Sequence, residues 1–196
     1  MTYSHSTGWK AGALSVALML VSAPAFAQSA MSMSNMGKTV MVGGAAMYPS
    51  KNIVQNAVNS NDHTTLVAAV KAAGLVDTLS GPGPFTVFAP TNEAFDKLPP
   101  GTVDTLVKPE NKAALTKVLT YHVVAGKHSA KDLMDLVKAG GGKATLTTVE
   151  GEKLVVMQTG MKLMLTDAKG GVSTVTIGDV NQSNGVIHVV DTVLMP

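Results

Sequence analysis

The hydrophobic pattern of this chain changes its period part of the way along, and that change restricts the fold to a mixture of helices and sheet. Between residues 52 and 139, apolar side chains mostly recur every three to four residues, as on one face of a helix. Between residues 144 and 194, short runs rich in valine and threonine alternate with glycine turns, which is typical of strands. No internal repeat is present. We therefore predict one α+β domain.

One apolar run interrupts the helical half, and one turn stands out in the strand half. Residues 85–89 carry apolar side chains on nearly both faces, which predicts a buried central strand. Asp62 is a predicted N-cap for a helix that ends near Gly74. Asn184-Gly185 is the strongest hairpin signal of the chain.

The chain has no cysteine among its 196 residues. This excludes disulfides, thiolate nucleophiles and zinc–thiolate or iron–sulfur sites. It also excludes the cysteine on which a bacterial lipoprotein carries its lipid. The core alone therefore has to stabilise the domain.

The N-terminal residues predict export. Residues 1–27 have a positive flank at Lys10, a short apolar run and a small-residue cleavage pattern that ends at Ala27, as in a signal peptide. Residues 28–47 are rich in serine, glycine and methionine without a period, which predicts a flexible linker. The folded domain is then expected over residues 48–196. No further run is long and apolar enough to cross a bilayer, so the mature chain is expected in the periplasm or outside the cell.

The linker also supports an alternative function. Thioethers are soft ligands that suit Cu(I), and five methionines lie in this segment: Met31, Met33, Met36, Met41 and Met47. A periplasmic Cu(I)-handling protein is therefore the alternative to a binding module. Against it, the linker has no histidine or cysteine.

The rest of the composition argues against other classes of protein. The formal charge of +2 comes from lysine alone, since the chain has no arginine, and this does not fit a nucleic-acid binder. The histidines match no zinc-binding spacing, and no nucleophile motif is present. We expect no metal, no cofactor and no enzymatic activity, and no residue pattern sets the oligomeric state.

Three segments, in this order, resemble the signature regions of the fasciclin domain family. Residues 85–95 resemble its first box, Tyr121-His122 its central motif, and residues 185–196 its second box. The resemblance extends from about residue 52 to residue 196. The box residues it singles out are Thr86, Phe88, Pro90, Thr91, Phe95, Gly185, His188 and Asp191.

The resemblance implies a fold and a function. The expected fold has helices packed around a β-sandwich or wedge-shaped sheet. The expected function is non-catalytic adhesion to a cell-surface, matrix or envelope partner, either a protein or a glycan. Asp191 follows an apolar strand, and as part of the second box it is expected to have a hydrogen-bonded structural role.

Tyr121 and His122 form the motif most often linked to adhesion in that family. The residues themselves favour another role for His122. Leu115, Val118, Leu119 and His122 follow a helical spacing that turns the imidazole inward. A buried imidazole organises a core and does not contact a ligand. We therefore weigh a structural role for His122 above direct binding.

Overall fold

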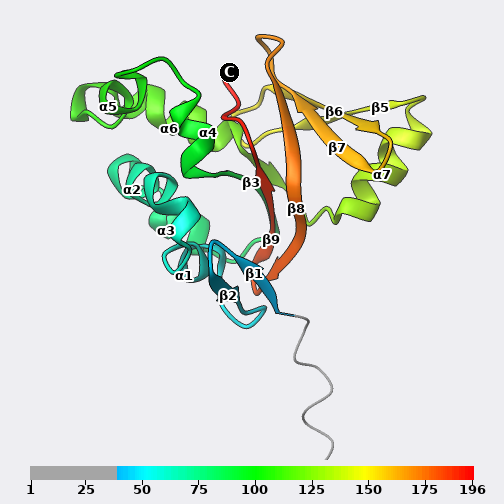
Figure 1. Cartoon of the computed structure of the whole chain (residues 1–196), viewed down its shortest axis with the longest axis horizontal. Coiled ribbons are helices and arrows are strands. Elements are labelled where there is room, and N and C mark those ends of the chain that lie inside the picture. The colour runs from blue at the N-terminus through cyan, green and yellow to red at the C-terminus, as the bar shows by residue number, and fades with distance from the viewer. Residues whose placement is uncertain (1–38) are drawn as a thin grey trace, which may run out of the picture. The chain divides into compact units, whose positions relative to one another are not determined.

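The structure, a computed structural model, describes residues 39–196, and its main element there is a seven-stranded sheet (Figure 1). In spatial order the strands are β4 (Val123–Ala125), β3 (Phe85–Pro90), β9 (Gly185–Val190), β8 (Val172–Gln182), β7 (Lys162–Thr166), β6 (Lys153–Thr159) and β5 (Lys143–Thr147). Among these seven strands of the described residues, only β3 and β9 are parallel neighbours. The sheet nearly closes on itself, because Val124 bridges Thr148 and the Val149 N–H donates to the Val123 carbonyl at 2.7 Å.

The helices lie on both sides of this sheet. Those of residues 39–196 are α1 (Ile53–Ala57), α2 (Thr64–Ala73), α3 (Val76–Ser80), α4 (Asn92–Asp96), α5 (Thr102–Leu106), α6 (Lys112–Tyr121) and α7 (Ala130–Ala139), with short 3-10 turns at Asn61–His63 and Pro109–Asn111. In Figure 1, α1, α2 and α3 lie on one side of β3 and β9, and α7 lies beside β5, β6 and β7. Within the described residues, no helix combines the length and the apolar character needed to cross a bilayer. The predicted α+β class is confirmed.

Two hydrophobic clusters pack on opposite faces of β3. Val87 and Ala89 join the cluster formed with α1, α2 and α6, whereas Phe88 joins the cluster formed with α7 and β5 to β7. Alternate side chains of a strand point to opposite faces. The strand is buried on both faces for this reason, as its apolar run predicts.

The last residues of the predicted linker are ordered, which corrects that prediction. β1 (Val40–Val42) and β2 (Ala45–Met47) form an antiparallel hairpin. Gly43 and Gly44 join them with φ angles of 57° and 74°, which glycine adopts without strain. Val42 and Met47 are each only 3% exposed, so burial of these two side chains in the core explains the order. The predicted signal peptide and residues 28–38 of the predicted linker lie outside the described residues.

Helix α2 begins differently from the prediction. Asp62 lies in the preceding 3-10 turn and does not cap the helix, which starts at Thr64. The cap is supplied by Asn92, whose side-chain oxygen accepts from the Thr65 N–H at 3.1 Å and the Thr64 hydroxyl at 3.2 Å. Gly74 ends the helix in the left-handed conformation, as predicted.

The hairpin between β8 and β9 turns one residue earlier than the prediction, at Ser183 and Asn184. Asn184 occupies this turn because its side chain bonds three backbone groups of neighbouring segments. Its oxygen accepts from the Ile53 N–H at 3.0 Å, and its amide group donates to the carbonyls of Leu79 at 2.8 Å and Gly81 at 2.9 Å. One side chain therefore holds the turn, α1 and the end of α3 together.

Candidate functional site

The Tyr121-His122 motif lies at the C-terminal end of α6, inside the domain. His122 is 2% exposed and Tyr121 is fully buried. The Leu194 N–H donates to Nε2 of His122 at 3.0 Å, so Nε2 carries no proton and Nδ1–H donates to the Val118 carbonyl at 2.8 Å. The inward orientation that the helical spacing predicts for His122 is confirmed.

The protonation of His122 follows from this position. Burial lowers the pKa of His122 to about 4, against the opposing effects of the Val118 carbonyl and the Asp167 carboxylate. The imidazole is therefore neutral at physiological pH, and both of its nitrogens are already paired. It has no group left to offer a partner at the surface.

Tyr121 connects three parts of the chain through its hydroxyl. The hydroxyl donates to the Lys153 carbonyl at 3.0 Å and accepts from the Ala168 N–H at 3.0 Å. Burial raises the pKa of Tyr121. The residue thus fixes α6 against β6 and against the loop after β7.

His188 of the second box is also an internal residue. It is fully buried, and its ring stacks on Phe88 of the first box with the centroids 5.7 Å apart. The Asp179 N–H donates to Nδ1 at 3.3 Å, and Nε2–H donates to the His128 carbonyl at 2.9 Å. Burial lowers its pKa, so His188 is neutral and in the opposite tautomer to His122. Both histidines thus act as fixed hydrogen-bond connectors between strands and loops.

The remaining first-box residues support the backbone around β3. The Thr86 hydroxyl donates to the Gly126 carbonyl at 2.7 Å and accepts from the His128 N–H at 2.9 Å. Thr91 caps α4, where its hydroxyl accepts from the Ala94 N–H at 3.3 Å. Two further box residues, Pro90 and Phe95, are buried in the same region.

Gly185 allows the two boxes to pack against each other. A Cβ atom at this position would lie 2.1 Å from the Phe85 carbonyl oxygen. Real side chains do not approach a backbone atom so closely, so only glycine fits here. The parallel pairing of β3 with β9 begins at this contact.

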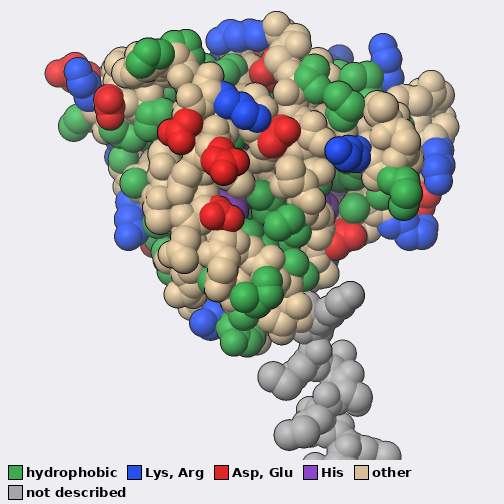
Figure 2. Space-filling view, in the orientation of Figure 1, with side chains coloured by type: hydrophobic (Ala, Val, Ile, Leu, Met, Phe, Trp, Pro, Cys, Tyr) green, Lys and Arg blue, Asp and Glu red, His purple; other side chains and the backbone are tan. Residues whose placement is uncertain are grey.

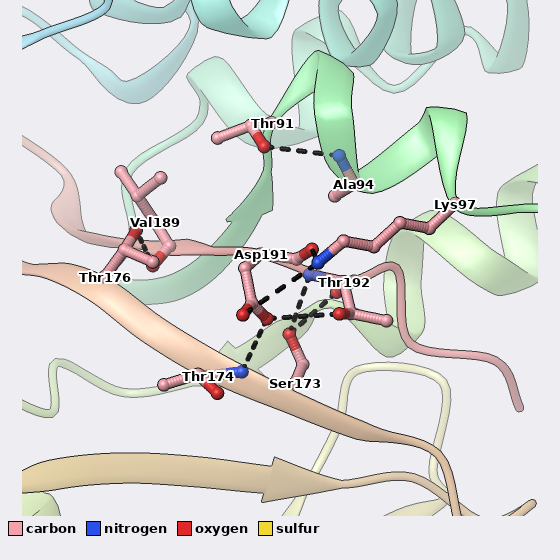
Figure 3. A network of polar contacts seen from close by, with 9 residues as sticks. All are labelled: Thr91, Ala94, Lys97, Ser173, Thr174, Thr176, Val189, Asp191 and Thr192. Atoms are coloured by element: carbon pink, nitrogen blue, oxygen red, sulfur yellow. Dashed lines mark hydrogen bonds and ion pairs between the residues drawn. The ribbon is translucent and has the colours of Figure 1, made fainter.

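Asp191 lies in a polar network at the end of β9 (Figure 3). Its Oδ1 accepts from the Thr174 N–H at 2.8 Å and from the Thr192 hydroxyl at 3.1 Å. Lys97 Nζ lies 4.0 Å from Oδ2 and donates to the Asp191 carbonyl at 2.6 Å. The Ser173 hydroxyl donates to the Thr192 carbonyl at 2.8 Å. The network joins β8, the end of β9 and the residue that follows α4.

The electrostatics of Asp191 fit this connecting role. Partial burial raises its pKa, but the hydrogen bonds from Thr174 and Thr192 and the charge of Lys97 outweigh that effect, and the pKa lies below its usual value. The carboxylate is therefore ionised and engaged by donors.

One connecting residue escaped the sequence analysis. Asp167 is 8% exposed and accepts from the N–H groups of Lys169 at 3.0 Å, Gly171 at 2.7 Å and Met195 at 3.0 Å. The aspartate before Lys169-Gly170-Gly171 signals a turn in which the side chain binds the backbone two residues on. The Met195 N–H that Asp167 also binds lies 28 residues further along the chain, and no local sequence pattern indicates this contact.

The described residues offer little to a metal ion. Among residues 39–196, no three His, Asp or Glu side chains lie close enough together to hold one. Met47 of the predicted copper-binding set is buried in the core, whereas Met41 is 61% exposed. Met31, Met33 and Met36 lie outside the described residues.

Comparison with known proteins identifies the family. The profile of the Fasciclin domain matches residues 61–196. Protein sll1483 of Synechocystis sp. is 46% identical over 159 residues, which are 81% of this chain and 81% of that protein. The immunogenic protein MPB70 of Mycobacterium bovis is 39% identical over 145 residues, 71% of this chain and 66% of that protein.

Two further comparisons concern a surface protein and a solved structure. The cell surface glycolipoprotein MPB83 of Mycobacterium bovis is 38% identical over 160 residues, 79% of this chain and 64% of that protein. The FAS1 domain pair of the insect cell adhesion molecule Fasciclin I superposes with a TM-score of 0.68 at 19% identity, covering 76% of this chain and 52% of that one. That likeness shows the fold. Because the family profile spans more than half of the sequence, this chain belongs to the fasciclin domain family.

Proposed function

We propose that this protein is an exported, non-catalytic binding module that attaches to a protein or glycan on a cell surface, in a matrix or in the envelope. The observation that carries the proposal is membership of the fasciclin family, together with the likeness to a mycobacterial cell surface glycolipoprotein over 79% of the chain. The signal-peptide pattern of residues 1–27 supports export.

The geometry of the motif residues directs the proposal to the exposed surface. Tyr121, His122 and His188 are buried, and their polar atoms are paired within the domain. A partner therefore has to meet other side chains. Binding that is lost on substitution of these residues would reflect loss of the fold.

One exposed surface lies close to the first box. Figure 2 shows acidic side chains gathered around the position that α4 occupies in Figure 1. Glu93 and Asp96 are both exposed there, three residues apart on α4, and Asp62 lies across a small hollow from Glu93. We name Asp62, Glu93 and Asp96 the α4 acidic surface. It presents negative charge to a partner without involving a core residue.

The test is saturable binding of residues 28–196 to cells and to immobilised matrix proteins and glycans. We compare the wild type with the double variant Glu93→Ala/Asp96→Ala, and use Asp77→Ala/Glu110→Ala as the matched control. The control removes two exposed acids that lie elsewhere. We expect the first variant to weaken binding at unchanged melting temperature and the control to bind like the wild type.

Two results would contradict the proposal. If the protein binds saturably to none of the tested cells, matrix proteins and glycans, the adhesion role is refuted. A turnover activity of the purified domain that one exposed substitution abolishes replaces it with an enzymatic one. If both acidic variants bind like the wild type, adhesion stands and the α4 acidic surface is not its contact.

A further inference from the structure

Strands β5 to β8 form a part of the sheet that is covered on one face only. Buried and more exposed residues alternate along β5, β6 and β7, which is the pattern of a half-covered sheet. The strand register aligns Lys143, Met157, Met164 and Thr174 in one row across the four strands, on the face turned away from the cluster that α7 joins. We name the face of β5 to β8 that carries this row the outer face.

The apolar side chains of the outer face have no packing partner in the described part of the chain. Val155, Met157 and Met164 belong to neither hydrophobic cluster of residues 39–196. The alternate residues Leu154 and Val156, on the other face of β6, are completely buried in one of these clusters. The outer face is thus a surface that residues 39–196 leave open.

The charged residues of the outer face are all lysines. Lys143, Lys153 and Lys162 lie on it, and each is exposed and takes part in none of the ion pairs found among residues 39–196. From the rise per residue and the distance between strands, these lysines lie roughly 12 to 20 Å apart. The chain as a whole has 15 basic and 13 acidic residues, so a face with lysines and no acid departs from its composition.

The acids next to the outer face are engaged elsewhere. Glu150 and Glu152 lie in the turn between β5 and β6, where Glu150 accepts from the Thr120 hydroxyl at 2.9 Å and Glu152 pairs with Lys117 at 2.8 Å. Both contacts lead to α6. Asp167, in the turn after β7, is buried and accepts from backbone N–H groups. These three carboxylates therefore leave the lysines of the outer face uncompensated.

These features discriminate between classes of partner. A second copy of the chain would oppose lysines to lysines, because a two-fold interface brings the same surface of both copies together. Protein interfaces are enriched in aromatic residues and depleted in lysine, and none of the outer-face residues is aromatic. A bilayer-binding surface inserts large apolar side chains, whereas Met157 and Met164 are half-buried within their row. An anionic polymer that also offers hydroxyl groups matches the lysines and the threonines of this face.

We propose that the outer face binds an acidic polysaccharide, a chain of sugars that carries carboxylates at regular intervals. The ammonium groups of Lys143, Lys153 and Lys162 pair with carboxylates along one chain, and the exposed hydroxyls of Thr145 and Thr159 bond to sugar hydroxyls between them. Several weak contacts along one polymer add to each other. The inference rests on the proposed adhesion function and names a ligand class for a surface other than the α4 acidic surface.

The test measures the affinity of residues 28–196 for polygalacturonate by calorimetry. Three comparison ligands separate charge from sugar: methyl-esterified polygalacturonate has no charge, polyglutamate has no hydroxyl groups, and vesicles of phosphatidylglycerol and phosphatidylcholine present a negative lipid surface. We expect saturable binding of polygalacturonate, weaker binding of polyglutamate and the vesicles, and none of the methyl ester. A rise in ionic strength from about 0.01 M to about 0.15 M should weaken the binding, because exposed charges are screened.

Charge variants test whether the outer face is the contact. Lys143→Gln/Lys162→Gln should weaken polygalacturonate binding about fivefold at low ionic strength, since two exposed ion pairs are lost. The matched control is Lys108→Gln/Lys112→Gln, which makes the same change of net charge at exposed positions near the start of α6. We expect this control to bind like the wild type. Circular dichroism confirms that both variants are folded.

Methyl NMR of the methionines locates the ligand independently. Polygalacturonate should shift the signals of Met157 and Met164 on the outer face and leave that of Met47, buried in the core, unchanged. The proposal is overturned if these two signals do not move at saturation, or if the outer-face variant binds like its control. It is equally overturned if the methyl ester, polyglutamate or the vesicles bind as tightly as polygalacturonate. Saturable binding to cells that persists in any of these cases leaves adhesion in place and removes only this ligand.

Discussion

Replacement of His122 by alanine should destabilise the domain strongly without exposing any new surface to a partner. The change removes a fully enclosed ring that accepts from the Leu194 N–H and donates to the Val118 carbonyl. The Leu194 N–H then stays buried without an acceptor, which costs about 1–3 kcal/mol. The cavity left by the ring adds a further loss of order 1–2 kcal/mol by comparison with other core truncations.

The expected total is a fall of about 2–5 kcal/mol in the free energy of unfolding, a large part of the 5–15 kcal/mol typical of a domain. Urea denaturation followed by circular dichroism measures it. The matched control is His128→Ala: His128 is half-buried, and its ring makes no hydrogen bond to any of residues 39–196. We expect that control to stay within about 0.5 kcal/mol of the wild type.

A His122→Ala protein as stable as the His128→Ala protein would refute this reasoning. Surface binding measured on the same samples completes the test. If His122→Ala remains folded at the assay temperature and still fails to bind, His122 contacts the partner and its structural assignment is wrong. If the folded fraction of His122→Ala binds like the wild type, the role of the Tyr121-His122 motif is structural.

The domain should also lose stability in mild acid. The pKa of His122 is lowered from 6.5 to about 4 in the folded chain, so the unfolded chain takes up the proton first, and stability present above pH 6.5 is lost as the pH falls toward 4. His122 alone accounts for about 2–3 kcal/mol of loss between pH 7.5 and pH 4.5, which denaturation curves would show as a decline that begins near pH 6.5; a flat profile contradicts the neutral buried ring. Gly185→Ala should lower the melting temperature sharply or prevent folding, because its Cβ would overlap the Phe85 carbonyl, and a wild-type melting temperature would disprove that contact. Asn184→Ala should cost about 2–3 kcal/mol in unfolding experiments, since three backbone groups lose a partner, whereas Asn181→Ala, an exposed neighbour, should cost under about 1 kcal/mol.

Local patterns predict the parts of this fold that depend on periodicity. The stripe that includes Leu115, Val118 and Leu119 indicates both helix α6 and the inward orientation of His122. The apolar run at residues 85–89 indicates a strand buried on both faces. In each case the signal comes from residues within one or two turns of each other, so the sequence carries it directly.

The parts that local patterns do not predict depend on distant partners. The hairpin of residues 40–47 has strands of three residues within a glycine- and alanine-rich segment, and it is held to the domain by burial of Val42 and Met47 and by the bond from the Asn61 N–H to the Gly43 carbonyl. The cap of α2 comes from Asn92, 27 residues after the Thr65 N–H that it accepts from. The partner of His122 is Leu194, 72 residues further along. The spacing thus indicates that the imidazole is buried, but not what it holds.

The contacts of the last residues also set the order in which the domain can form. β3 pairs with β9 across about 100 residues, and the backbone of Leu194 and Met195 is bound by His122 and Asp167. None of these contacts can exist until the segment 185–195 has been synthesised. During translation, β3 in the first half of the chain therefore has no β9 to pair with. Such long-range closure slows folding. Under the export proposed here, we expect that delay to help keep the chain unfolded and fit for passage through a membrane pore until residues 185–195 have been made.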